Sequence, residues 1–396
     1  MSIQNKKGVK ILLCPDKFKG SLSSAQASNA IEKGLIKRAS SADNYPTLEF
    51  AKVTIADGGD GSQEIIENLY KAQKVAVKTY NATGDKITGE YLLYNTNNKK
   101  NAFIEMAKIC GLAMLDKSQR NPLYTSTYGL GIAIKDALEK GAEVITLSIG
   151  GSATNDGGIG MLESFGIEFF GEDGKHVGAA QENKTFLSGK DLEKIRRIEY
   201  KNPVMPQGFE FRVICDVSNP LLGENGATYV YGPQKGADSQ MLRQLEQGMA
   251  NYVSSNERTA HYANVPGAGA AGGVGFACIA YLNATLISGW RFFAEITSLE
   301  EKIKWADLVI TGEGSIDSQS LQGKVIDGVL TIAQKYNKDV AAFCGVSKLG
   351  KTDKTTLKCY QITSIEGNVD KCMTQAESLL EELAFTAGEE LLANFR

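Results

Sequence analysis

One pattern constrains the fold of this 396-residue chain more than any other. Apolar runs typical of buried strands end in short polar loops rich in glycine, and amphipathic segments follow them. The first instance is VKILLCPDKFKGS followed by SSAQASNAIEKGLIKRA, with Ser23 or Ser24 as the helix cap. The pattern recurs at 51–70, 143–165, 306–336 and 339–346. Such alternation predicts a mostly parallel sheet with helices on both faces.

A second kind of pattern interrupts this alternation. Residues 75–107 alternate around a Gly84–Asp85 turn, which predicts antiparallel hairpins, and 168–210 adds further loops and hairpins. We therefore expect an α/β protein with a doubly wound, mostly parallel, Rossmann-like domain, a second mixed α/β domain inserted into it, and an interdomain cleft. The expected domains are 1–75 plus 290–396 and, inserted, 76–289. Chain length also favours two domains over one.

Charge and composition exclude several classes of partner. A net charge of -3 gives no electrostatic reason to expect nucleic acid. The first apolar run ends at Pro15, too early for a signal peptide, and Gly275, Asn283 and Gly289 make 273–290 a buried helix rather than a membrane span. Seven cysteines without CxxC spacing are typical of the reducing cytoplasm. We expect a cytoplasmic protein that binds small molecules, and a homodimer is one assembly that this allows.

The polar loops carry the residue types that phosphate chemistry needs. Since the chain has only two histidines, a Ser-His-Asp triad or a His-built zinc site is not expected, and Asp or Glu is the expected general base. The loops combine glycine with carboxylates, amides and, in two of them, lysine, which suits a Mg-phosphate group. Each alone could be an ordinary turn, whereas together they favour a ligand site. They are 15–21, 56–62, 150–158, 215–220, 232–237 and 311–319.

Common nucleotide-binding signatures are missing. GAGAAG at 267–272 satisfies GxGxxG, but it follows Pro266 instead of a buried strand, so it does not predict a nicotinamide cofactor. The small residues of GAGAAG are explained equally well by close packing at the start of a helix and by backbone N–H groups that bind an anion. Neither GxxxxGK[ST] nor HRDxxxxN occurs.

Individual residues leave two interpretations open. Lys19 and Lys235 could be solvated or could pair with an anion. Asp156 and Asp216 follow apolar runs, which favours a place in a cleft, although each could be a turn-former or cap. The same ambiguity holds for Asp57, Glu313 and Asp317. Asn155 and Asn219 suit hydroxyl recognition, although Asn219 precedes Pro220 and could simply shape its loop.

Taken in order, the loops resemble those of the bacterial type I glycerate kinase family. The matching stretches are PDKFKGSLS, ADGGDGS, IEMAKICGL, RNPLYTSTYGLG, IGGSATNDGGIGML, CDVSNPLLGENGA, YGPQKGA, GAGAAGGVG and ITGEGSIDSQSLQGK. The resemblance implies ATP-dependent phosphorylation of D-glycerate to 2-phosphoglycerate in a two-domain protein with its site in the cleft. GGSATNDGG would then form a wall of the cleft, with side chains small enough for a polyanion to approach the backbone.

The resemblance also implies roles for individual residues. Asp216 or Asp156 would orient or deprotonate the glycerate hydroxyl, and Lys19 and Lys235 would offset phosphate and carboxylate charge. The implied ligands of Mg²⁺, direct or through water, are Asp57, Glu313 and Asp317. The implied substrate and ATP contacts are Asp16, Ser21, Gly58, Gly59, Gly150, Gly151, Ser152, Thr154, Asn155, Asn219, Gln234, Lys235 and Gln319.

Four positions depart from the family pattern. Lys17 replaces serine, Asp60 glutamate, Ser315 arginine and Ile326 proline. Losing an arginine removes a fixed, forked cation, which leaves the role of the GEGSID loop open. Two other hypotheses stay open: an NAD-dependent hydroxyacid oxidoreductase, and a non-catalytic regulator that binds glycerate or nucleotide, which the Ser315 departure supports.

Overall fold

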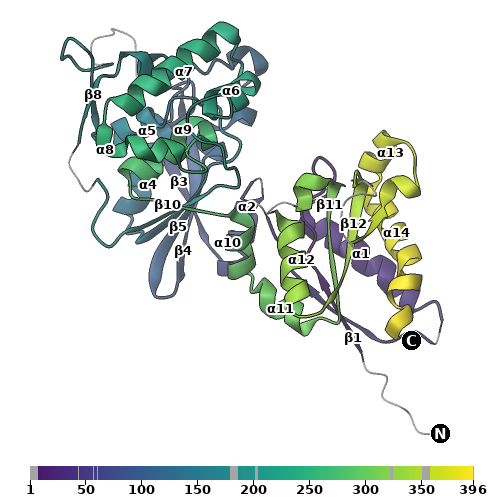
Figure 1. Cartoon of the computed structure of the whole chain (residues 1–396). Helices are drawn as coiled ribbons and strands as arrows, with labels where there is room; N and C mark the ends of the chain where they lie inside the picture. Colours follow the sequence, from purple (N-terminus) through teal and green to yellow (C-terminus); the bar gives the residue numbers. More distant parts are fainter. Residues whose placement is uncertain are drawn as a thin grey trace. The chain divides into compact units, whose positions relative to one another are not determined.

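The chain folds into two compact units (Figure 1). The computed structural model describes residues 8–42, 44–56, 58–59, 61–178, 186–200, 204–321, 324–349 and 357–395. Unit 1 comprises Met1–Asp57 and Trp290–Arg396, and unit 2 comprises Gly58–Gly289. Helix α10 (Gly289–Ile296) begins at the second boundary.

Unit 1 contains a five-stranded parallel sheet. Its strands are β1 (Val9–Leu13), β2 (Leu48–Lys52), β11 (Leu308–Ile316), β12 (Asp339–Ser347) and β13 (Lys358–Gln361), in the order β13-β12-β11-β1-β2. Renumbered along the chain, this is the order 2-1-3-4-5 of flavodoxin-like sheets. The strand order reverses between β1 and β11, and ligands of such sheets bind beyond the carboxyl ends of the strands at that point.

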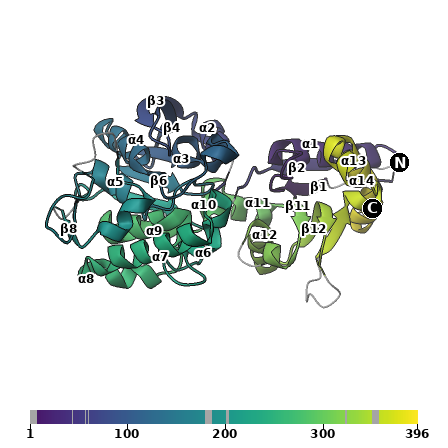
Figure 2. The same cartoon turned by 90° about the horizontal axis from the view of Figure 1, so that it is seen from above.

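Helices cover both faces of this sheet, as predicted (Figure 2). Residues of β1 are buried on both faces, which explains the unbroken apolar run in the sequence. Ser23 caps the first helix in a capping box with Gln26. One face carries α1 (Ser24–Ala39), α13 (Val369–Thr374) and α14 (Ala376–Leu391), and the other carries α11 (Leu299–Trp305) and α12 (Val325–Lys335).

Unit 2 contains a mixed six-stranded sheet in the order β10-β9-β6-β5-β4-β3. Four strands are parallel: β10 (Thr285–Ile287), β9 (Glu210–Ile214), β6 (Val144–Ser148) and β5 (Lys99–Glu105). β4 (Lys86–Thr96) and β3 (Gln73–Tyr80) extend the sheet as the antiparallel hairpin predicted around Gly84–Asp85. β7 (Glu168–Phe170) and β8 (Arg197–Glu199) form a separate antiparallel pair.

The first unit boundary lies at 57/58, earlier than the predicted 75/76. Helix α2 (Ser62–Tyr70) contacts β4 and β5, and β3 pairs with β4, so both elements belong to unit 2. The segment 51–70 has the pattern of one β-loop-α unit. Its strand and its helix nevertheless pack in different units, because the helix finds its partners further along the chain.

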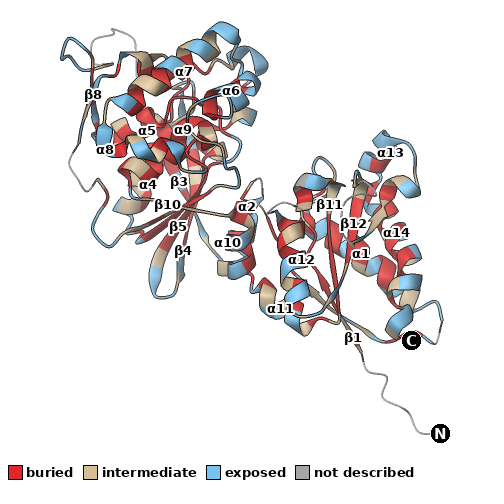
Figure 3. Ribbon diagram, viewed as in Figure 1, coloured by how far each residue is buried: buried red, intermediate tan, exposed pale blue. Residues whose placement is uncertain are grey.

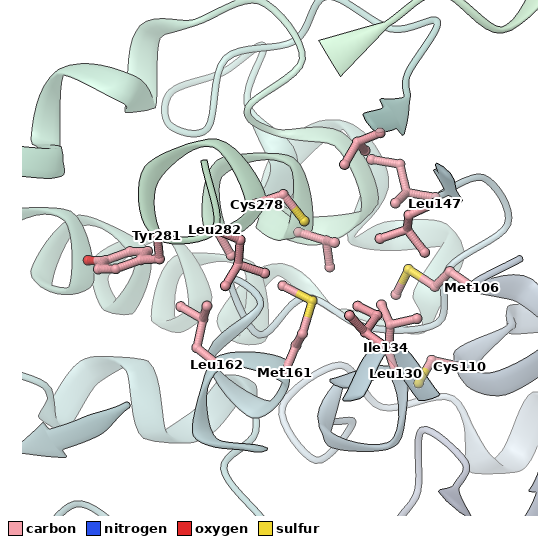
Figure 4. Close-up of a cluster of buried hydrophobic side chains, with 14 of the residues drawn as sticks. Met106, Cys110, Leu130, Ile134, Leu147, Met161, Leu162, Cys278, Tyr281 and Leu282 are labelled. Carbon is pink, nitrogen blue, oxygen red and sulfur yellow. The ribbon is translucent and has the colours of Figure 1, made fainter. Parts of the chain in front are cut away.

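A large apolar core joins the unit 2 sheet to its helices. The segment 273–290, predicted to be one buried helix, is helical only to Tyr281, in α9 (Ala270–Tyr281), and then forms β10 and the start of α10. Figure 4 shows Cys278 and Tyr281 of α9 among side chains of α4 (Tyr128–Glu139), α5 (Ile159–Ser164) and β6. The strands of both units are buried while the outer helix faces are exposed (Figure 3). The remaining helices of unit 2 are α3 (Ala107–Cys110), α4 (Tyr128–Glu139), α5 (Ile159–Ser164), α6 (Ala227–Tyr231), α7 (Ser239–Ser254) and α8 (Glu257–Ala260).

Across the described ranges, every helix falls short of the length and apolarity that crossing a membrane requires.

Candidate functional site

The loop after β1 lies at the switch point of the unit 1 sheet. Backbone N–H of Asp16 donates to the carbonyl of Gly312 at 2.8 Å, which ties this loop to β11. Phe18 is buried and forms a β-bridge with Leu22, so the intervening residues make a tight turn. Lys19 is exposed in this turn. The fold therefore presents one lysine to solvent where such sheets bind ligands.

Strand β11 runs beside this lysine loop. A Cβ atom on Gly314 would lie 3.3 Å from the backbone nitrogen of Lys19, so glycine permits the close approach. The neighbouring Glu313 is half-buried. Asp317 accepts a hydrogen bond from the backbone N–H of Ser320 at 3.3 Å and starts a short 3-10 helix. Lys19 and Glu313 are thus brought to one edge of unit 1, and Asp317 directly follows the end of β11.

Two smaller predictions also fall in this unit. An Asp16 carboxylate oxygen accepts from the Lys17 backbone N–H at 2.7 Å, and the Ser21 hydroxyl donates to the Phe18 carbonyl at 3.1 Å. Both side chains help to shape the turn around Lys19. The remaining two predictions of this kind, Asp57 and the side chain of Gln319, lie outside the described residues.

In unit 2, two glycine loops meet at the carboxyl ends of the parallel strands. A Cβ atom on Gly150 would lie 3.9 Å from the Gly58 carbonyl oxygen and 4.0 Å from Gly59 Cα. A Cβ atom on Gly58 would lie 2.2 Å from a methyl carbon of Ile214, so a larger residue does not fit at position 58. Gly150 and Gly151 are exposed. A ligand can therefore approach their backbone closely.

Asp216 follows β9 at the same edge. One of its carboxylate oxygens accepts from the Ser288 hydroxyl at 2.9 Å and from the Gly289 backbone N–H at 2.8 Å. These bonds fix the carboxylate against the end of β10, yet the residue is exposed. Asp216 is thus oriented and open to solvent, which a group that binds a substrate hydroxyl requires.

Asp156 occupies a different environment. It is 0% exposed and accepts from the backbone N–H and hydroxyl of Thr127 at 2.8 and 2.7 Å and from the backbone N–H groups of Gly158 and Gly160. Burial raises the pKa of Asp156, while these hydrogen bonds lower it. The carboxylate thus joins the start of α4 to that of α5, and its side chain is buried.

Lys235 is buried as well. Its ammonium donates to the Ser152 hydroxyl at 3.0 Å and to the Thr154 carbonyl at 2.6 Å. Burial lowers the pKa of Lys235 to about 7, and the charge of Asp156 opposes this shift. Asn155 is also buried and donates to the Thr228 hydroxyl at 3.2 Å. Lys235 therefore fixes the loop after β6 from within, and this loop exposes its two glycines.

The last two predicted residues lie on loops nearby. The Asn219 amide donates to the carbonyl of Asn225 at 2.8 Å and accepts from the Tyr231 hydroxyl at 2.6 Å, so it holds its own loop together. Gln234 is exposed. Ser288 carries no sequence signal of its own, because only the pairing of β10 with β9 brings it to Asp216.

The fold and these loops define an α/β protein with exposed glycine loops, an exposed lysine and an oriented carboxylate at the carboxyl ends of its strands, where α/β proteins bind their ligands. A sequence model of the Glycerate kinase family matches residues 11–391. The chain belongs to that family, which confirms the family predicted from the loops and the predicted class of enzyme, a kinase. Membership implies ATP as co-substrate.

Individual relatives agree over most of the chain. A glycerate kinase of Halalkalibacterium halodurans is 38% identical, over 94% of this chain and 96% of its own. A glycerate 2-kinase of Escherichia coli is 39% identical, over 85% of each chain. A crystal structure of a protein assigned as glycerate kinase 2 from Salmonella typhimurium LT2 is 33% identical, with a TM-score of 0.76, and covers 98% of this chain and 99% of that chain. These similarities support the predicted two-domain α/β fold.

Proposed function

We propose that this protein transfers the γ-phosphoryl group of ATP to the 2-hydroxyl of D-glycerate. Family membership supports the reaction, and the name of the Escherichia coli relative supports the 2-position. Within the structure, the observation that carries the proposal is Asp216. It is an exposed carboxylate, oriented by hydrogen bonds from Ser288 and Gly289, at the sheet edge that also exposes Gly150 and Gly151.

Asp216 is the residue that we expect to receive the glycerate hydroxyl. Its carboxylate, oriented by Ser288 and Gly289, would orient the hydroxyl and accept its proton during transfer. Gly150 and Gly151 would offer backbone N–H groups to the negative charge of the substrates. Catalysis of this kind depends on positioning and on electrostatic stabilisation.

In unit 1, Lys19 would pair with phosphate oxygens. Its turn lies beside Gly314 at the switch point of the sheet, where bound ligands of this fold class lie. An exposed ammonium can follow the charge as it moves between the oxygens during transfer. Asp156 and Lys235 would act indirectly, by fixing the loop after β6.

The half-buried carboxylates of unit 1 fit Mg²⁺, because oxygen is its preferred ligand. Mg²⁺ is usually held by one or two carboxylates together with substrate phosphates. Glu313 and Asp317 would supply those carboxylate oxygens, directly or through water. Within the described ranges no three His, Cys, Asp or Glu residues lie close enough to hold an ion together. The bound ion would neutralise phosphate charge.

A coupled ADP-release assay with D-glycerate, followed by phosphorus NMR of the product, tests the proposal. We expect ADP release that depends on D-glycerate and a resonance of 2-phosphoglycerate. A resonance of 3-phosphoglycerate alone would contradict the assigned hydroxyl. Tight binding of ATP and glycerate without ADP release would contradict the activity and favour a regulatory role.

A further inference from the structure

The glycine loop at the start of unit 2 is held at both of its ends by two neighbouring strands. Ser148, the last residue of β6, donates its hydroxyl hydrogen to the Gly58 carbonyl. Glu105, the last residue of β5, accepts from the backbone N–H of Gln63 at 2.9 Å. Glu105 and Ser148 are direct partners in the parallel pairing of β5 with β6. One strand pair therefore fixes both ends of the segment 58–63.

The carboxylate of Glu105 accepts a hydrogen bond from the first turn of helix α2. The first N–H groups of a helix have no partner within the helix, and a side chain at the N-cap position usually supplies one. The N-cap of α2 is Gly61, which has no side chain to do so. Glu105 supplies the acceptor from another element, and its negative charge also suits a helix N-terminus.

A third contact reinforces this end of the segment. The ammonium of Lys108 donates to the side-chain oxygen of Gln63 and to a carboxylate oxygen of Glu90 at 2.5 Å. Gln63 and Glu105 are 3% and 6% exposed. Their hydrogen bonds are thus protected from water, and the segment has little freedom to move at Gln63.

We propose that Glu105 is a positioning residue for phosphoryl transfer. By fixing Gln63 while Ser148 fixes Gly58, it keeps Gly58 and Gly59 against Gly150 in the second glycine loop. This inference rests on the proposed function, in which Gly150 contacts the substrates. A displacement of about 1 Å in such a site costs roughly a hundredfold in rate.

Kinetics of three variants test the role of Glu105. In Glu105→Ala we expect kcat to fall by about a hundredfold, with KM for D-glycerate and ATP changed less than about threefold. Glu105→Gln retains an acceptor oxygen and loses only the charge, so we expect a fall of about tenfold. Glu172→Gln is the matched control, since Glu172 is an exposed carboxylate of unit 2 outside this network, and its kcat should stay near that of the wild type.

Hydrogen exchange followed by mass spectrometry gives a readout that is independent of activity. In Glu105→Gln, amides of 58–63 should exchange at least about tenfold faster than in the wild type, while α4 and α9 exchange as before. Ser148→Ala should have the same effect from the other end of the segment. It keeps the inference testable if Glu105→Ala does not fold.

The two proposals fail in different ways. No ADP release from the wild type would overturn the proposed function and, with it, the catalytic role of Glu105. An active wild type with normal kcat in Glu105→Ala would overturn this inference alone. So would unchanged exchange of 58–63 in both Glu105→Gln and Ser148→Ala.

Discussion

The burial of Lys235 predicts a pH-dependent contribution to stability. Its pKa is lowered from 10.5 to about 7 in the folded chain, because burial disfavours the ammonium. Between these values the unfolded chain binds a proton that the folded chain has released. The contribution of Lys235 to the free energy of unfolding therefore rises as pH increases from about 7 towards 10.5. This stabilising contribution is lost as pH falls through the folded pKa.

The expected magnitude follows from the same two values. Linkage gives a slope that approaches about 1.4 kcal/mol per pH unit between the two pKa values. Integrated from pH 7 to pH 9, the contribution of Lys235 rises by about 2 kcal/mol. In Lys235→Met this term is absent. The difference in unfolding free energy, wild type minus variant, should therefore grow by about 2 kcal/mol over that range.

Urea unfolding at several pH values measures this difference, and subtraction cancels every other titrating group. Both tryptophans, Trp290 and Trp305, lie in unit 1, so their fluorescence identifies its transition, while circular dichroism follows both units. Lys175→Met is the matched control because the Lys175 side chain is 82% exposed and folding leaves its ammonium in water.

Parallel curves for the wild type and Lys235→Met would refute the reasoning. They would mean that the short bond from the ammonium to the Thr154 carbonyl, together with the charge of Asp156, keeps Lys235 protonated despite its burial. A charged donor strengthens such a bond, which is why the experiment discriminates between the two effects.

Four further predictions concern the site and the backbone. Lys19→Ala should lower kcat/KM by roughly a hundredfold, about 3 kcal/mol of transition-state stabilisation, whereas Lys17→Ser changes it little; the reverse order would show that Lys17 faces the ligand. Asp216→Asn should lower kcat by about a hundredfold or more and leave the melting temperature near that of the parent, and a normal kcat would exclude Asp216 as the base. Excess chelator should abolish ADP release, with Mg²⁺ restoring it; full turnover in chelator would contradict a metal requirement. Ala271 has a φ of 54°, so Ala271→Gly should stabilise the chain by up to about 1 kcal/mol in thermal melts, and destabilisation would show that its methyl group packs favourably.

Local patterns in the sequence were sufficient for much of the fold. The β-loop-α alternation, the Gly84–Asp85 hairpin and the Ser23 cap each depend on neighbours within a few residues. The boundary at 57/58 does not. It depends on whether α2 packs on the strands before it or after it, and the amphipathic pattern of a helix is the same in both cases.

The same limit applies to the site, and the two aspartates show it most clearly. Asp156 and Asp216 both follow apolar strands, and their local sequences do not distinguish a ligand-binding carboxylate from a buried one. Their surroundings come from distant segments: Thr127 encloses one, while Ser288 and Gly289 orient the other and leave it exposed. The carboxylate of Asp156 accepts its hydrogen bonds from the protein and so stabilises the fold. Asp216 is exposed and held in a fixed orientation, so it is the aspartate of the two that we expect to meet a substrate hydroxyl.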